Sequence, residues 1–192
     1  TMNIVKKILG TQINHEITRL IKKFGGNAIS FNQSKYQIVN ATKKSFEDGT
    51  DLGLVGEVIK IRTSDLKKSL RNGFIPVIAP IGVSKNNEFL NINADEVAGE
   101  VAQALKAEKL ILLTDVKGIG DSDNKLISKI SLSKGQKILK EKFIKGGMTP
   151  KLLSALSARR NGVKSCHIID GRVPHAVLLE VLTEEGVGTM IS

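Results

Sequence analysis

The chain is poor in the residues that form disulfides, stack on bases or span membranes. Among its 192 residues there is one cysteine, Cys166, so no internal disulfide can form, and this favours a reducing compartment. Tryptophan is absent and aromatic residues make up only 4%, whereas single-strand nucleic-acid binders interleave basic and aromatic side chains. No apolar run reaches the roughly 20 residues of a membrane span. The sequence therefore predicts no nucleic-acid partner and no membrane partner.

The chain does contain an excess of basic residues. Lysine and arginine number 29 against 19 acidic residues, which gives a net charge of +10. Such a balance suits a phosphorylated small molecule, a nucleic acid or simply well-solvated faces. The lysines are scattered along the chain, so the last of these is favoured. The length fits one domain, or one large lobe, with a substantial core.

The first half of the chain is typical of a long helix followed by short strands. Apolar residues recur at helical spacing over residues 3–24, and Gly25–Gly26 ends the run. The patterns then predict strands at 28–31, 36–39 and 54–61, a loop at 43–51, and a helix capped by Ser64 that ends at Gly73. The run FIPVIAPIGV, residues 74–83, is typical of strands covered on both faces.

The second half alternates buried strands with amphipathic helices. Helices are expected through Val97, Val101 and Leu105, over 150–160 and over 174–182, and strands over 110–115, 166–170 and 188–192. This alternation predicts an α/β layered fold with a mainly parallel sheet.

The segment NINAD, residues 91–95, places amides and a carboxylate in a short polar cluster. If the segment is extended, Asn91 and Asn93 point to the same face. Asn93 to Glu96 also matches a capping box, and Asp95 suits a helix N-terminus. Capping accounts for Asn93, Asp95 and Glu96 but leaves Asn91 unexplained, so a binding role and a structural role both stay open here.

Two further segments are candidates for a phosphate site. LLTDVKGIGD is a strand running into a turn, and ligands of open α/β sheets bind at the carboxyl ends of strands, although Asp115 could simply close that turn. KGGMTPK leads through a glycine pair into a helix with Lys151 near its start. A lysine there opposes the helix dipole, and an anionic ligand would explain it, as would plain solvation.

The tail offers no nucleophilic or metal-binding arrangement. His167 and His175 lie eight residues apart on different predicted elements, without metal-ligand spacing to acidic partners. No Ser/His/Asp arrangement is visible. Cys166 falls within a predicted buried strand, where a thiol is inert.

Taken together, these segments resemble the acetylglutamate kinases of the amino-acid-kinase superfamily. The matching motifs are DLGLVGEV, FIPVIAPIGV, NINAD, LILLTDVKGI, GGMTPK, HIIDGRVPHAVLLE and EEGVGTMIS, which cover nearly the whole chain. The resemblance implies a three-layer sandwich with residues 1–93 from a substrate-binding and dimerisation lobe and residues 94–192 as a nucleotide-binding lobe. It also implies ATP and Mg²⁺ as cofactors, N-acetyl-L-glutamate as substrate, arginine biosynthesis as the pathway, and the cytoplasm or plastid stroma as location.

The resemblance assigns roles residue by residue. Asn91 and Asn93 match the residues that hold the acetylated substrate, Asp95 the aspartate that orients catalytic lysines, and Lys151 the lysine that stabilises the transferring phosphoryl group. The nucleotide-binding segments correspond to Thr114, Asp115, Gly118, Gly146, Gly147 and Met148. The tail resembles arginine-sensitive members, with Glu180, Gly186, Gly188 and His167 as the inhibitor site, although Glu180 could also be an ordinary exposed helix residue.

The chain departs from the family pattern in what it lacks, and around residues 30–50 it matches the family poorly. The family's first third, with its phosphate-binding lysine and glycine loops and a substrate-binding arginine, has no counterpart, so we expect these 192 residues alone to be inactive or very weak. The intact protein is expected to be a homo-oligomer, a dimer or hexamer, with a nitrogen-signalling protein as a further partner. Two alternatives stay open: a related kinase acting on carbamate, aspartate or a nucleotide, and a non-catalytic arginine-binding module.

Overall fold

A computed structural model describes residues 1–45, 48–123, 125–140, 144, 146–183 and 186–192. The chain forms two compact units, Thr1–Val97 and Ala98–Ser192. Their boundary falls inside helix α5 (Ala94–Leu105), four residues beyond the division that the family resemblance implies.

The first unit begins with the predicted long helix, which is confirmed. It consists of α1 (Met2–Lys7), a π-helical stretch η1 (Ile8–Ile13) and α2 (Asn14–Lys23). The buried Asn14 fastens this helix to the parallel strands β1 (Ala28–Phe31) and β4 (Ile75–Ile78). Its amide donates to the Val77 carbonyl at 2.8 Å and accepts from the Ser30 hydroxyl.

Four strands of the first unit close into a small barrel in the order β2-β3-β6-β5. They are β2 (Val39–Ser45), β3 (Asp51–Ile61), β5 (Ile81–Val83) and β6 (Phe89–Asn91). The strand predicted at 36–39 is wrong, because a short helix α3 (Gln33–Tyr36), begun by the Asn32 side chain accepting from the Lys35 N–H, precedes β2. The predicted loop at 43–51 is shorter than expected, because β2 continues through polar Lys43 and Lys44 to Ser45.

Two smaller predictions for the first unit also need correction. Helix α4 (Ser64–Arg71) has Thr63 at its cap position and no side-chain cap bond, so Ser64 is not the cap. The apolar run over 74–83 divides into β4 and β5 around Ala79–Pro80. Ile75 is 48% exposed, so β4 is not covered on both faces as the run suggested.

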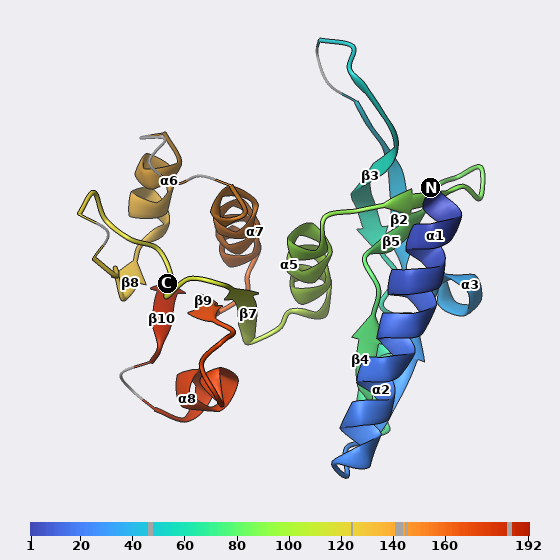
Figure 1. Cartoon of the computed structure of the whole chain (residues 1–192), viewed down its shortest axis with the longest axis horizontal. Helices are drawn as coiled ribbons and strands as arrows, with labels where there is room; N and C mark the ends of the chain where they lie inside the picture. The colour runs from blue at the N-terminus through green and yellow to red at the C-terminus, as the bar shows by residue number, and fades with distance from the viewer. Residues whose placement is uncertain (46–47, 124, 141–143, 145, 184–185) are drawn as a thin grey trace. The chain divides into compact units, whose positions relative to one another are not determined.

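The second unit is a four-stranded sheet in the order β7-β9-β10-β8. Its elements are β7 (Lys109–Thr114), β8 (Lys129–Ile130), α6 (Leu132–Lys140), α7 (Met148–Arg160), β9 (Ser165–Asp170), α8 (Ala176–Leu182) and β10 (Gly188–Ile191). Strands β7 and β9 are parallel, and β10 is antiparallel to β9. Helices α6 and α7 lie on one side of this sheet and α8 on the other (Figure 1).

The α/β class predicted from the sequence is therefore confirmed, with layered helices and strands. Five of the eight described strand pairings are parallel, which agrees with a mainly parallel arrangement. The core of the second unit gathers Leu112, Leu152, Ile168 and other apolar side chains between the sheet and its helices. Burying such side chains is the main source of folding free energy. Within the described residues no helix has the length and apolarity needed to cross a membrane.

Candidate active site

A cavity of about 490 Å³ opens at the carboxyl ends of β7 and β9, beside the first turn of α7. Its lining consists of Leu113, Thr114, Asp115, Val116, Gly147, Met148, Lys151 and Arg172. Strand register brings the two ends together, because Thr114 pairs with Asp170 and the Gly171 N–H donates to the Thr114 carbonyl at 2.8 Å. This is the edge at which open α/β sheets bind ligands.

Five of the residues predicted to bind a nucleotide line this one cavity: Thr114, Asp115, Gly147, Met148 and Lys151. They come from two segments that are more than 30 residues apart in the sequence. Two others, Gly118 and Gly146, do not line it. The structure thus brings the two predicted nucleotide segments together without assigning a ligand to them.

The first turn of α7 suits an anion. The helix begins at Met148, two residues before the predicted start, with Gly147 at the cap position and no acidic residue in its first turn. Its leading N–H groups have no intrahelical partner, and the helix dipole adds partial positive charge there. Lys151, half-buried, adds a full positive charge in the next turn. Backbone donors and a lysine at one point are a recurrent phosphate-binding arrangement.

Asp115 is exposed at the end of β7, and its carboxylate accepts a long hydrogen bond of 3.4 Å from the Thr114 hydroxyl. Within the described chain it does not bond the backbone that follows, so the turn-closing interpretation is not supported. A turn-closing aspartate does occur further along the segment. The Asp121 carboxylate accepts from the N–H groups of Asp123 and Lys125, each at 2.9 Å.

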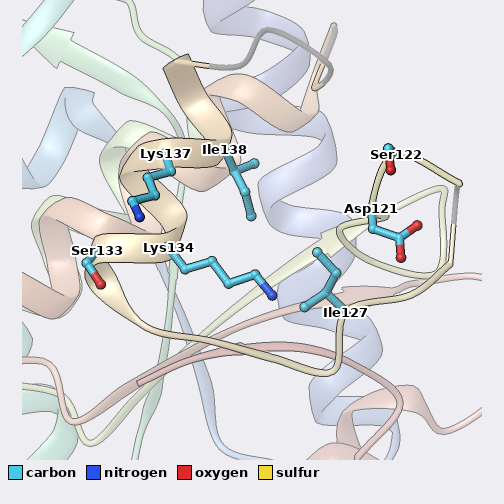
Figure 2. Close-up of a pocket in the computed structure, with 7 residues that line it drawn as sticks. All are labelled: Asp121, Ser122, Ile127, Ser133, Lys134, Lys137 and Ile138. Carbon is cyan, nitrogen blue, oxygen red and sulfur yellow. The ribbon is translucent and has the colours of Figure 1, made fainter.

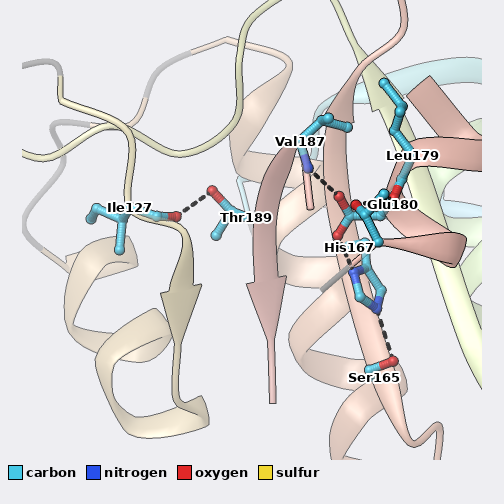
Figure 3. A network of polar contacts seen from close by, with 8 residues as sticks. Ile127, Ser165, His167, Leu179, Glu180, Val187 and Thr189 are labelled. Atoms are coloured by element: carbon cyan, nitrogen blue, oxygen red, sulfur yellow. Dashed lines mark hydrogen bonds and ion pairs between the residues drawn. The ribbon is translucent and has the colours of Figure 1, made fainter. Parts of the chain in front are cut away.

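Gly118 has a packing role instead of a place in the cavity. A Cβ at this position would lie 2.8 Å from the Thr189 hydroxyl oxygen, and its φ of 144° is one that residues with side chains rarely adopt. Thr189 is buried and accepts from the Ile119 N–H at 2.8 Å. Its hydroxyl donates to the Ile127 carbonyl at 2.7 Å (Figure 3). Gly118 therefore lets the segment after β7 pass against β10.

Sequence reasoning missed Arg172, which also lines the cavity. Its Nε donates to Asp170 Oδ1 at 2.9 Å and its Nη2 to Oδ2 at 2.8 Å, and its backbone N–H donates to the same carboxylate at 3.0 Å. These bonds lower the pKa of Asp170 to about 2. The available signal was IIDGR, a buried strand with a polar end, which parallels LLTD on the neighbouring strand.

In the first unit, Asn91 ends β6 and Asn93 lies two residues further on. Ile92 between them is 3% exposed, while Asn91 is half-buried and Asn93 exposed, as expected for two asparagines on one face. Asn93 caps α5, because its side-chain oxygen accepts from the N–H groups of Asp95 at 2.8 Å and Glu96 at 3.3 Å. Asp95 is half-buried in the first turn of α5.

The predicted capping box is only half formed. Glu96 does not return to the Asn93 N–H but accepts from the Val58 N–H of β3 at 2.7 Å. The β2–β3 register shifts at this point, where Asn40 pairs with Lys60 and Ala41 with Val58. Glu96 thus connects the barrel to the first turn of α5. This contact between distant residues cannot be predicted from the local sequence.

The predicted arginine-site residues form a buried network in the tail (Figure 3). His167 Nδ1 lies 2.5 Å from Glu180 Oε1, and His167 Nε2 lies 2.9 Å from the Ser165 hydroxyl. The Val187 N–H donates to Glu180 Oε2 at 2.7 Å. Glu180 is 6% exposed, so the interpretation of an ordinary exposed helix residue is wrong.

Both tail glycines lie against this network. Gly186 has a φ of 63°, and a Cβ on it would be 2.9 Å from the Glu180 carboxylate. A Cβ on Gly188 would collide with the Ile168 carbonyl on the paired strand. The structure therefore brings Glu180, His167 and Gly186 together and places Gly188 at the adjoining strand contact.

Other features of the described chain carry no predicted role. A second cavity, of about 580 Å³, lies between α6 and the segment before β8, with Lys134, Lys137 and Asp121 among its lining (Figure 2). Within the described residues no three His, Cys, Asp or Glu side chains cluster as metal ligands. Cys166 is fully buried, and burial raises the pKa of its thiol to about 11, which agrees with the expected inertness.

A cavity at the carboxyl edge of parallel strands, with a helix N-terminus and a lysine, defines an α/β protein equipped to bind a phosphorylated ligand. The chain belongs to the amino acid kinase family, whose model matches residues 1–170.

Among curated proteins, the chain is 46% identical over 203 residues to the acetylglutamate kinase of Methanocaldococcus jannaschii. It is 48% identical over 197 residues to that of Nitrosomonas eutropha. Both alignments cover the whole chain, which spans 68% and 67% of the two relatives.

Among solved structures, the chain is similar to the N-acetylglutamate synthase from Neisseria gonorrhoeae complexed with coenzyme A and N-acetyl-glutamate. The match covers the whole of this chain and 43% of the synthase chain, with 26% identity and a TM-score of 0.89. The chain is also similar to the same synthase complexed with coenzyme A and L-arginine. That match covers 87% of this chain and 38% of the synthase chain, with 28% identity and a TM-score of 0.76.

Proposed function

We propose that the protein is a phosphotransferase that transfers the γ-phosphoryl group of ATP to the side-chain carboxylate of N-acetyl-L-glutamate, in arginine biosynthesis. The observation that carries this is the 46% and 48% identity to acetylglutamate kinases over the whole chain. The cavity beside α7 supports the nucleotide part of the reaction, because two distant nucleotide-type segments converge there.

Phosphoryl transfer from ATP to a carboxylate requires no covalent intermediate with the protein. Phosphoryl transfer depends on positioning and on stabilising charge, and the substrate carboxylate is itself the nucleophile. We assign Lys151 and the first N–H groups of α7 to the phosphates, with Lys151 countering the charge on the transferring group. Mg²⁺ would enter with ATP, since this ion is commonly held by phosphates, waters and one or two carboxylates.

The acceptor is assigned to residues of the first unit. Asn91 and Asn93 carry amides that can donate to the carboxylates or the acetyl oxygen of the substrate and accept from its N–H. Asp95 is assigned to keep catalytic lysines charged and oriented, as an acidic neighbour does. Asn93 would then serve both as helix cap and as substrate ligand, which its position at the exposed start of α5 permits.

We assign arginine inhibition to the tail network. Glu180 supplies a carboxylate for a guanidinium, with which it can form two parallel hydrogen bonds. The fold match to a synthase complexed with L-arginine supports this assignment. In the described structure the same carboxylate is occupied by His167 and Val187, so an arginine ligand would have to replace these partners.

The test is ADP release by the purified protein with ATP, Mg²⁺ and N-acetyl-L-glutamate, with and without arginine, alongside direct measurement of ATP binding. We expect ADP release by the intact protein that depends on the acetylated substrate and falls with arginine. Release with carbamate or aspartate instead would support the related-kinase alternative. Arginine binding without any ATP binding would overturn the kinase proposal in favour of a non-catalytic arginine module.

A further inference from the structure

We infer that the Asp170–Arg172 pair is the nucleoside-contacting end of the cavity, with Arg172 laid against the base or ribose and Lys151 serving the phosphates. This inference rests on the proposed ATP-dependent function and adds to it a residue pair that fixes how the nucleotide lies.

Arg172 shares the cavity with the predicted nucleotide-binding residues but comes from another strand end. Arg172 lines the same cavity as Thr114, Asp115 and Lys151, yet it comes from the segment after β9. The β7–β9 register holds that segment beside the end of β7, through the Thr114–Asp170 pairing and the bond from the Gly171 N–H. The cavity edge is thus built from two strands, and only one of them carries a residue predicted to bind nucleotide.

The Arg172 guanidinium is held in place by Asp170. The Asp170 side chain is 7% exposed and accepts from Nε, Nη2 and the backbone N–H of Arg172. A guanidinium carries five N–H donors, so about three remain after two bind Asp170. The Arg172 side chain itself is 67% exposed. A planar cation is therefore fixed by its inner edge while its faces and outer donors can reach a ligand.

Charge is unevenly distributed around the cavity. Arg172 is compensated by Asp170, and Asp115 adds a negative charge, while Lys117 lies near enough to Asp170 to lower its pKa slightly further. Lys151 and the α7 N-terminus form the opposite, positively charged part. A triphosphate suits the backbone N–H donors of a helix N-terminus with a lysine beside them, whereas a planar guanidinium already paired with a carboxylate suits the face of a base or a ribose hydroxyl.

The experiment compares how ATP and inorganic tripolyphosphate bind to the wild-type protein, Arg172→Ala, Arg172→Lys and Lys151→Ala. Both dissociation constants are measured by calorimetry. We expect Arg172→Ala to weaken ATP about 3- to 30-fold, as for the loss of one cation–aromatic contact, and to leave tripolyphosphate within about twofold. Lys151→Ala should weaken both ligands.

Further readouts separate contact from structural damage. Arg172→Lys should not restore ATP affinity, because an ammonium cannot keep the two-point bond to Asp170 while presenting a flat face. In turnover assays Arg172→Ala should raise KM for ATP with kcat nearly unchanged. Arg172→Gln serves as a second variant if the alanine protein unfolds.

Failure of the Arg172 assignment can be told apart from failure of the proposed ATP-dependent function. If the wild-type protein binds neither ATP nor tripolyphosphate, the proposed function fails. If the wild type binds ATP and Arg172→Ala binds it equally well, only the nucleoside assignment is overturned. If Arg172→Ala weakens tripolyphosphate as much as ATP, Arg172 is a phosphate ligand and the inferred orientation is wrong.

Discussion

His167 and Glu180 form a buried pair that joins strand β9 to helix α8, with Nδ1 and Oε1 2.5 Å apart. Their side chains are each 4% exposed, and Glu180 also holds the Val187 N–H just before β10. One carboxylate therefore ties a strand, a helix and the chain leading to the last strand. The same carboxylate is the group that we assign to an arginine guanidinium.

Substituting this carboxylate by an amide tests the assignment. Glu180→Gln keeps the shape and an acceptor oxygen for Val187 but removes the charge. We expect arginine to inhibit the variant at least about 10-fold more weakly, since charge-assisted hydrogen bonds contribute about 1.5–3 kcal/mol. The measurement is the arginine concentration that halves ADP release.

Glu100→Gln is a suitable control, because Glu100 also bonds a neighbouring side chain, Gln103, at 3.1 Å but lies outside the tail network. Arginine should inhibit this control as it does the wild type. Unchanged arginine sensitivity in Glu180→Gln would remove Glu180 from the inhibitor site.

Gly186 should tolerate a side chain poorly, for two reasons that can be separated. Its φ of 63° costs an alanine about 1–2 kcal/mol, and the new Cβ would press on the Glu180 carboxylate at 2.9 Å. Gly146 has nearly the same φ, 59°, with nothing within 4 Å of the added Cβ. We therefore expect Gly186→Ala to lower Tm by more than Gly146→Ala, in thermal unfolding followed by circular dichroism. Equal shifts would mean that the tail network yields to the methyl group.

Much of the second unit could be predicted because its signals are local. The apolar run before Asp115 and the run from Cys166 to Asp170 are both short and bounded, so strand assignment follows from pattern alone. Only the second run is almost wholly buried, because Leu113 in the first is 51% exposed. The cavity beside α7 also follows, since strand ends and helix starts meet at one edge of a parallel sheet.

The rest depends on contacts between distant residues. Helix α6 carries Gly135 at its centre, which a propensity argument counts against a helix, yet a Cβ there would lie 2.7 Å from the Leu156 side chain. Glu96 looked like a capping residue and instead bonds Val58, 38 residues away. Arg172 was missed because its significance comes from the neighbouring strand end. For Gly135 and Glu96, tertiary contact overrode local preference.

Substitution can separate the two roles of Asn93, as cap of α5 and as substrate ligand. Asn93→Asp keeps the oxygen that caps α5, so its stability should stay within a few tenths of a kcal/mol of the wild type. It also replaces the amide donor with a negative charge, which should raise KM for N-acetyl-L-glutamate through repulsion of the substrate carboxylates. Asn93→Ala should lose about 0.5–2 kcal/mol of stability as well. The measurements are urea unfolding and substrate titration, and an unchanged KM in Asn93→Asp would leave Asn93 as a helix cap alone.

Asp170 should make stability depend on pH in the acid range. Arg172 lowers the folded-state pKa of Asp170 from its ordinary 3.8 to about 2, so the folded protein holds this proton less tightly than the unfolded chain. The contribution is therefore fully present above about pH 4 and is lost as the pH falls toward 2. Asp170→Asn should be less stable than the wild type at pH 7, and the difference should shrink between pH 4 and pH 2. Urea midpoints at several pH values measure this, with Glu108→Gln as control. Glu108 pairs with Lys164 at 2.6 Å and both side chains are largely exposed, so the control should change the midpoint little. A difference between Asp170→Asn and wild type that stays constant down to pH 2 would show that the pair does not stabilise the fold through its charge.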